Sequence, residues 1–144
     1  MPIKAVLDTS ILISAFLKHG GVNALVVQAG KNQYQLFLSQ AILEETGRVL
    51  LTYGHIRKKY NYSDKEVREY LASLRKAAKR ILRKVLDIKV IAEDPDDDFI
   101  LACALKIKAD YIVSKDNHMQ NLKQYQGIKI ISTQDFLKLL GNKN

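Results

Sequence analysis

The 144 residues carry 23 Lys and Arg against 15 Asp and Glu, a formal net charge of +8 at pH 7. The length fits one domain over residues 1–144, because chains of about 150 residues bury roughly two-thirds of their unfolded surface. A single cysteine excludes a disulfide framework, and with no signal-like start and no apolar run of about 20 residues we expect a cytoplasmic protein without membrane contact. The charge favours nucleic acid as a partner, although many soluble proteins are basic without such a role.

The first half of the chain alternates short apolar strands with helical patterns. Each strand is an apolar run that stops at polar residues, and each helix has apolar residues three and four apart. The predicted elements are, in order, a strand over 3–7, a helix from Ile11, a helix over 22–29, a strand over 34–38 and a helix capped by Ser39. The apolar face of this last helix comprises Ile42, Leu43, Thr46, Val49 and Leu50.

The second half continues the alternation. Ser63-Asp64-Lys65-Glu66 has the form of a capping box and predicts a helix with a basic outer face. Its inward residues are predicted to be Val67, Tyr70, Leu71, Leu74, Ala78 and Ile81. There follow a strand over 88–92, a helix from Asp94 to about Lys108, strands over 111–113 and 129–131, and a helix over 133–140. This order predicts an α/β fold with three layers, α-β-α, around a central, mainly parallel twisted sheet.

Acidic residues stand at the ends of two predicted strands. Ligands of open α/β sheets bind outside the carboxyl ends of the strands, which selects Asp8 and Asp116. Each acid taken alone is weak evidence, because an aspartate after a strand is more often a helix cap or turn residue. The run from Asp94 to Asp98 offers a further candidate, and periodicity does not decide between Asp97 and Asp98.

Helical spacing separates two neighbouring glutamates. Glu45 has Ile42 and Val49 three and four residues away and therefore borders the buried face, whereas Glu44 belongs to the solvated side with Arg48 as a surface ion-pair partner. A carboxylate directed inward must be protonated, paired or bound to a cation. The alternative is a glutamate whose carboxylate reaches out to solvent.

These acids suit a hard cation. One cysteine and three scattered histidines, His19, His55 and His118, have no zinc-ligand spacing, and the chain has no glycine-rich phosphate loop. Carboxylates without imidazole or thiolate favour Mg²⁺ or Mn²⁺, and such an ion also catalyses phosphodiester hydrolysis.

Four segments together resemble PIN-domain nucleases, and most closely their toxin-like branch, the toxin half of a toxin–antitoxin pair. They are Asp8-Thr9-Ser10, Ser39 six residues before Glu45, the run Asp94-Pro95-Asp96-Asp97-Asp98-Phe99-Ile100-Leu101-Ala102-Cys103-Ala104-Leu105, and Ala109-Asp110-Tyr111-Ile112-Val113-Ser114-Lys115-Asp116. Each is short and unspecific, but their order and spacing are specific, and the resemblance spans nearly the whole chain.

The resemblance implies a catalytic and metal-binding quartet, Asp8, Glu45, Asp97 and Asp116, that holds Mg²⁺ or Mn²⁺. Asp97 is preferred to Asp98 because the family places this acid seven residues before the small residue matched by Ala104. Supporting positions around the ligands would be Thr9, Ser10, Ser114 and Asp98. His118 stands where many relatives have another acid, which leaves a second metal ion open.

The implied activity is hydrolysis of RNA by a metal-dependent endoribonuclease, with an antitoxin protein as partner and a homodimer as the expected assembly. Basic residues would bind the substrate, in one cluster of Arg57, Lys58 and Lys59 and a second of Arg75, Lys76, Lys79, Arg80, Arg83 and Lys84. Tyr53, Tyr60 and Tyr62 flank the first cluster and are suited to stack on unpaired bases. A merely solvated helix face explains the second cluster equally well.

Two other functions fit parts of the pattern. A phosphotransfer domain also places an aspartate after its first parallel strand, but the phosphatase pattern needs a second aspartate where this chain has Ser10. A PIN-like module that only binds RNA or protein is the other alternative, and the retention of all four acids argues against it.

Overall fold

The computed structural model describes residues 2–18, 26, 29, 31–83 and 95–141, with only the backbone described for 95–98. In chain order the elements are β1 (Lys4–Leu7), α1 (Thr9–Leu17), β2 (Gln35–Ser39), α3 (Gln40–Thr52), α4 (Gly54–Tyr60), α5 (Asp64–Ala77), β3 (Ala78–Leu82), α6 (Pro95–Ile107), β4 (Tyr111–Val113), α7 (Asn117–Leu122), β5 (Gln124–Tyr125), β6 (Ile128–Ile131) and α8 (Thr133–Gly141).

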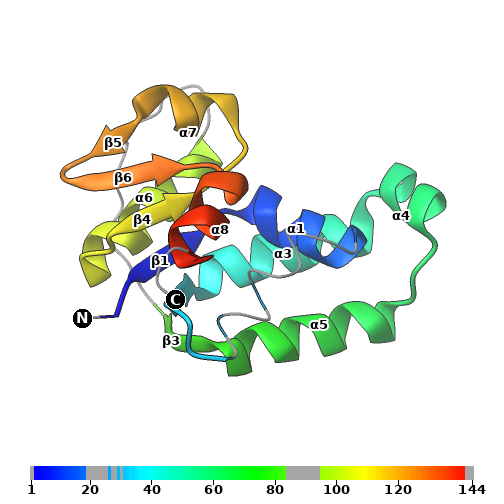
Figure 1. Cartoon of the computed structure of the whole chain (residues 1–144). Coiled ribbons are helices and arrows are strands. Elements are labelled where there is room, and N and C mark those ends of the chain that lie inside the picture. Colours follow the sequence, from blue (N-terminus) through cyan, green and yellow to red (C-terminus); the bar gives the residue numbers. More distant parts are fainter. Residues whose placement is uncertain (1, 19–25, 27–28, 30, 84–94, 142–144) are drawn as a thin grey trace.

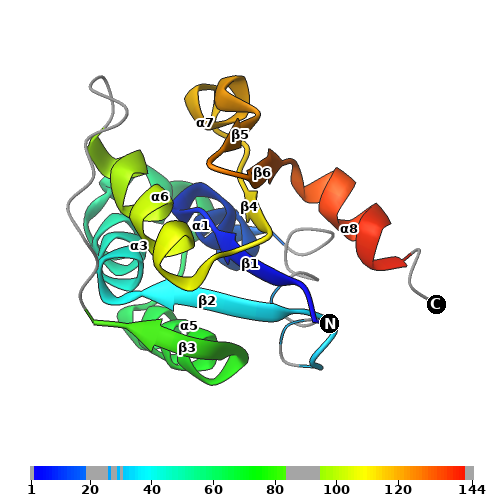
Figure 2. The same ribbon diagram turned by 90° about the vertical axis from the view of Figure 1, so that its left-hand side faces the viewer.

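The described strands form one sheet in the order β3-β2-β1-β4-β6-β5. All neighbouring pairs are parallel except the hairpin of β5 and β6. The carboxyl ends of β3, β2, β1, β4 and β6 therefore meet at one edge of the sheet. Helices α1, α3 and α5 cover one face and α6 covers the other (Figures 1 and 2). The predicted three-layer, mainly parallel fold is confirmed.

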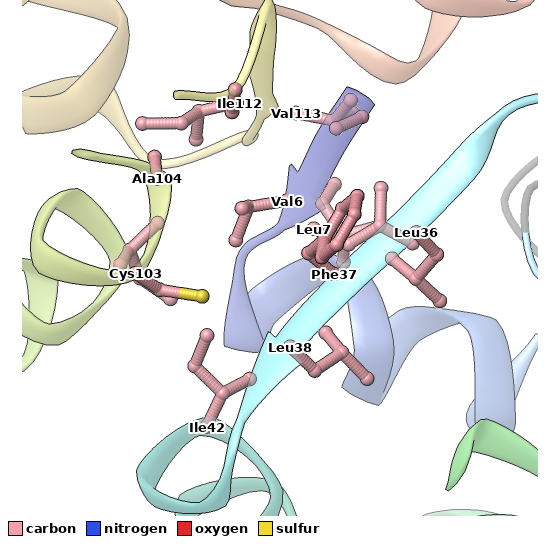
Figure 3. Packing of buried hydrophobic residues seen from close by; sticks show 14 of the residues in the cluster. Val6, Leu7, Leu36, Phe37, Leu38, Ile42, Cys103, Ala104, Ile112 and Val113 are labelled. Carbon is pink, nitrogen blue, oxygen red and sulfur yellow. The ribbon is translucent and has the colours of Figure 1, made fainter. Parts of the chain in front are cut away.

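The core lies where the central strands pack between the helical layers. Strands β1, β2 and β4 contribute continuous apolar runs, including Val6, Leu36 and Ile112, that are fully buried because both faces of the sheet are covered. Cys103 and Ala104 on α6 face these strands (Figure 3). Cys103 is a buried packing residue, as expected, and burial raises the pKa of its thiol to about 12.

Local capping chemistry determines several of the helix starts. Ser39 accepts a hydrogen bond from the Ile42 N–H, and Ser63 forms the predicted capping box with Glu66. All five residues predicted for the apolar face of α3 are buried. Helix α1 begins at Thr9 rather than at Ile11, because Asp8 itself is the N-cap.

The prediction of one long helix after Ser63 is wrong at its end. Helix α5 stops at Ala77, and Ala78–Leu82, predicted as helix, form β3. Ala78 has extended backbone angles, and the strand that follows pairs with β2, so tertiary pairing overrides local helical propensity. Helices α4 and α7 and strand β5 were not predicted. The predicted helix over 22–29 and strand over 88–92 lie outside the described residues, apart from Val26 and Ala29.

No helix in the described ranges is both long enough and apolar enough to cross a membrane.

Helices α3 and α5 approach closely at Gly47, which is buried. A Cβ atom placed there would lie 3.1 Å from Leu71 Cδ1. We expect Gly47→Val to lower the free energy of unfolding by about 1–3 kcal/mol, because the added atoms force the two helices apart. Urea denaturation measures this change. Gly47→Ala is the control and should cost less, since Ala restores up to about 1 kcal/mol of helix propensity. A Val variant as stable as the wild type would contradict this packing.

Candidate active site

The candidate site is built around Asp8, directly after the central strand β1. Its side chain caps α1, and only 4% of the residue is exposed. Asp8 Oδ1 accepts hydrogen bonds from the Ser10 N–H at 2.6 Å and from the Ser10 hydroxyl at 2.8 Å. Asp8 Oδ2 accepts a hydrogen bond from the Ser114 hydroxyl. Both carboxylate oxygens are thus held in place, one by α1 and the other by the chain after β4.

Ser114 connects the two strand ends. Its Oγ donates to Asp8 and accepts a hydrogen bond of 3.0 Å from the Asp116 N–H. Asp116 in turn caps α7, because its Oδ1 accepts from the N–H groups of His118 and Met119 at 2.7 and 3.3 Å. The structure therefore brings Asp8, Ser114 and Asp116 together. As expected of a surface histidine, His118 is exposed, with Nδ1 4.0 Å from Asp116 Oδ1.

The strand register explains this meeting. Leu7 pairs with Val113, and the Asp8 N–H continues the ladder with a 3.0 Å hydrogen bond to the Val113 carbonyl. From β1 the chain order runs to β2 and β3 on one side, whereas β4 and β6 lie on the other. The two acids thus lie at the point where the strand order reverses, which is where open α/β sheets bind ligands.

The electrostatics of Asp8 fit a bound cation. Burial is the largest cause that raises the pKa of this carboxyl, the charge of Asp116 raises it further, and the hydrogen bonds from Ser114 and Ser10 lower it. None of the ion pairs between described side chains includes Asp8. The nearby ammonium of Lys115 donates instead to the Ser14 hydroxyl on α1. A buried carboxylate that no described cation pairs with and a second acid beside it match the oxygen ligands that Mg²⁺ and Mn²⁺ prefer.

Glu45 lies on α3 with a side chain only 13% exposed, as its helical position predicted. Its partner was predicted wrongly, because Arg48 pairs with Glu45 and not with Glu44. The Arg48 Nε lies 2.6 Å from Glu45 Oε1, and Nη2 lies 3.1 Å from Oε2. Exposed Glu44 accepts only a 3.4 Å hydrogen bond from the Gln40 amide among the described contacts. The bidentate geometry at i,i+3 favours the partly buried acid, whose charge most needs a partner.

The remaining predicted ligands begin α6. Asp97 and Asp98 lie in its first turn, but their side chains are not among those described, so the choice between them stays a prediction. Within the described part of the chain, no three His, Cys, Asp or Glu side chains are grouped closely enough to hold a metal ion. Asp8 and Asp116 thus form the part of the quartet that is brought together there.

Comparison with known proteins decides the family. A family model for the PIN domain matches residues 4–118. The chain belongs to the PIN-domain family. This family consists of nucleases that generally use divalent metal ions. The crystal structure of VapBC2 from Rickettsia felis bound to a DNA fragment from their promoter contains a chain of similar fold, with a TM-score of 0.61 and 14% identity, over 90% of this chain and 98% of that one. No curated protein matches the sequence.

In this PIN domain one contact to the site was not predicted from the sequence. Ser14 is buried on α1, and it accepts the hydrogen bond from Lys115, which stands between Ser114 and Asp116. The spacing of Ser10 and Ser14, four residues apart on one helix, is the signal that places both hydroxyls on the same side of α1.

The raised pKa of Asp8 predicts a pH dependence in the absence of divalent ions. The folded protein binds this proton more tightly than the unfolded chain, so the carboxyl favours folding at low pH. This contribution is lost as the pH rises from the ordinary value of 3.8 through the folded pKa. Asp8→Asn cannot titrate and still caps a helix. In the presence of chelator, the melting temperature of Asp8→Asn minus that of the wild type should therefore increase as the pH rises from 4 to 7. A difference that does not vary with pH would contradict the raised pKa.

Proposed function

We propose that this PIN domain is a metal-dependent endoribonuclease and the toxin component of a toxin–antitoxin pair. The observation that carries the nuclease proposal is the meeting of Asp8 and Asp116 at the carboxyl ends of two neighbouring strands. The match to a family of nucleases supports the interpretation of these two acids as ligands of a catalytic ion.

The proposed cation ligands are Asp8, Asp116, Glu45 and Asp97, with Asp98 as the alternative to Asp97. When bound, Mg²⁺ or Mn²⁺ lowers the pKa of water and stabilises the charge that develops as a phosphodiester is hydrolysed. The protein's own part is orientation. Ser10 and Ser114 fix both oxygens of Asp8, so that its carboxylate is held in place before any ion arrives. Thr9, the first residue of α1, is proposed to assist them.

Glu45 needs one rearrangement before it joins this set. To hold the cation, the Glu45 carboxylate would have to release the guanidinium of Arg48. The Glu45 side chain is only 13% exposed and its pair with Arg48 is bidentate, so the cation would have to take over the charge compensation that Arg48 now supplies. The Arg48 guanidinium carbon also lies 5.5 Å from the centroid of the Tyr53 ring, a second contact that does not involve Glu45.

The toxin proposal rests on the fold shared with a chain of the VapBC2 complex. An antitoxin protein is the partner that this proposal implies, and a homodimer remains a prediction. RNA is proposed as the substrate because of the net charge of +8 and the exposed basic residues.

RNA cleavage tests the nuclease proposal directly. The purified protein, incubated with total cellular RNA and Mn²⁺, should produce discrete fragments, and chelator should abolish them. Asp8→Asn and Asp116→Asn should each reduce the rate by at least about a hundredfold, because each removes a charged ligand of the catalytic ion. Asp135→Asn is the matched control, since Asp135 is an exposed acid in the first turn of α8, and none of the described ion pairs includes it. Wild-type rates in the first two variants would refute the site.

Thermal stabilisation separates an enzyme from a module that only binds. Mn²⁺ at about a hundred times its dissociation constant should stabilise the wild type by roughly 2.7 kcal/mol. Asp8→Asn should lose most of this gain, whereas Asp135→Asn should keep it. Stabilisation without cleavage of any RNA would favour the binding module, and no stabilisation at all would refute the metal site.

A further inference from the structure

The two clusters of basic residues differ in how far their charges are already used. In the first cluster, on α4, Arg57 forms a 2.7 Å ion pair with Asp64 and stacks over the Tyr62 ring at 5.2 Å. It also donates to the carbonyl groups of Leu51 and Tyr62. This arginine therefore ties α4 to the chain on both sides, and the cluster is left with Lys58 and Lys59 as exposed charges.

The second cluster, named here the β3 cluster, consists of Arg75, Lys76, Lys79, Arg80 and Arg83. All five are exposed, and none pairs with an acid among the side chains that the structure describes. The predicted member Lys84 lies outside the described residues. The register of β3 against β2 shifts between Leu36 and Phe37, so that Leu36 pairs with Ala78 and Phe37 with Arg80. This irregularity leaves consecutive Lys79 and Arg80 both facing solvent.

The sheet register connects the β3 cluster to the candidate site. Leu82 pairs with Ser39, and Val6 pairs with Phe37 two residues before Ser39. Continuing that register sets Leu82, Ser39 and Asp8 in one row across three neighbouring strands. Two interstrand spacings separate Arg83, the next residue of the chain, from the Asp8 row by about 10 Å.

Arg75 extends the cluster to the same edge of the sheet. Its guanidinium donates a 3.1 Å hydrogen bond to the side chain of Gln40, the first residue of α3 after Ser39.

The α4 cluster lies at the other end of α3, away from Ser39 and the candidate site. Helix α3 has 13 residues, so at 1.5 Å per residue α4 begins about 20 Å from Ser39. Figure 1 shows α4 at the far end of α3 and α5.

We propose that the β3 cluster binds the phosphate backbone of the RNA beside the cleavage site, and that the α4 cluster does not. This inference rests on the proposed nuclease function and specifies how its substrate lies. Arg83 lies about 10 Å from the Asp8 row, close to one Debye length at about 0.1 M salt, and the cluster extends from there along β3 as a row of cations that attracts the phosphates the acids themselves repel. Contacts to phosphate carry no base information, so binding by this cluster is independent of RNA sequence.

Two double variants with equal loss of charge test the proposal. Lys79→Gln with Arg80→Gln removes two exposed charges from the β3 cluster, and Lys58→Gln with Lys59→Gln removes two from α4. Both are made in the full chain carrying Asp8→Asn, so that RNA is bound without being cut. Binding of a fluorescein-labelled single-stranded RNA is followed by anisotropy as salt is varied.

The double variant of Lys79 and Arg80, called here the β3 pair, should weaken RNA binding about tenfold at low salt. It should also reduce the magnitude of the slope of log K against log salt by about 1.4, since each lost phosphate contact removes about 0.7. The α4 pair should change the slope by less than half of that. Equal effects of the two pairs would overturn the proposal, because net charge alone would then explain binding. A larger effect on duplex DNA than on RNA would also overturn it.

Folding and cleavage are controlled separately. If Gln at Lys79 and Arg80 lowers the melting temperature, Thr at both positions keeps strand propensity and removes the same charges. If the β3 cluster binds RNA but the protein cuts no RNA, the nuclease proposal is refuted and the β3 cluster proposal is not. Cleavage by the Asp8 protein with equal binding losses for both pairs would refute the β3 cluster alone.

Discussion

The burial of one carboxylate at the end of the central strand organises this molecule. Asp8 is almost fully removed from water, and a charge in that place is costly unless neighbouring groups satisfy it. Its oxygens accept hydrogen bonds from the start of α1 and from Ser114 after β4, so satisfying this carboxylate also fixes the junction of two strands and a helix. The hydrogen bonds only partly offset burial, since the pKa remains raised. The remaining deficit of positive charge is what makes the place suitable for a cation.

The same edge of the sheet is lined by polar residues that begin helices. Ser39 caps α3 after β2, Asp8 caps α1 after β1, and Asp116 caps α7 after β4. Capping positions require small oxygen-bearing side chains, and parallel strands gather these positions at one edge. A metal site at the carboxyl ends of the strands and the N-cap of a helix therefore require the same residue types. This overlap explains why a single aspartate after a strand is ambiguous in a sequence, and why two that meet are informative.

Features that depend on a few neighbouring residues could be predicted from the sequence. The capping box at Ser63 and the buried face of α3 are of this kind, and both agree with the structure. The end of α5 could not be predicted. The residues from Ala78 to Leu82 continue the helical pattern, but hydrogen bonding to β2 stabilises them as a strand more than a longer helix would. Periodicity placed Glu45 correctly but could not choose its partner, since positions three and four away are both within reach. Helix α4 has no buried residue and hence no apolar pattern to find.

The irregular pairing of β3 also affects how the molecule behaves toward its own copies. In the described part of the sheet β3 is the last strand on its side, and such a strand offers free backbone groups to any extended chain that approaches. Here the edge is short and interrupted, and it bears Lys79 and Arg80 side by side. A second molecule that approaches with the same edge meets like charge and a broken ladder of hydrogen bonds. Strand-to-strand aggregation through this edge is thereby disfavoured in a protein whose sheet is otherwise rich in apolar residues.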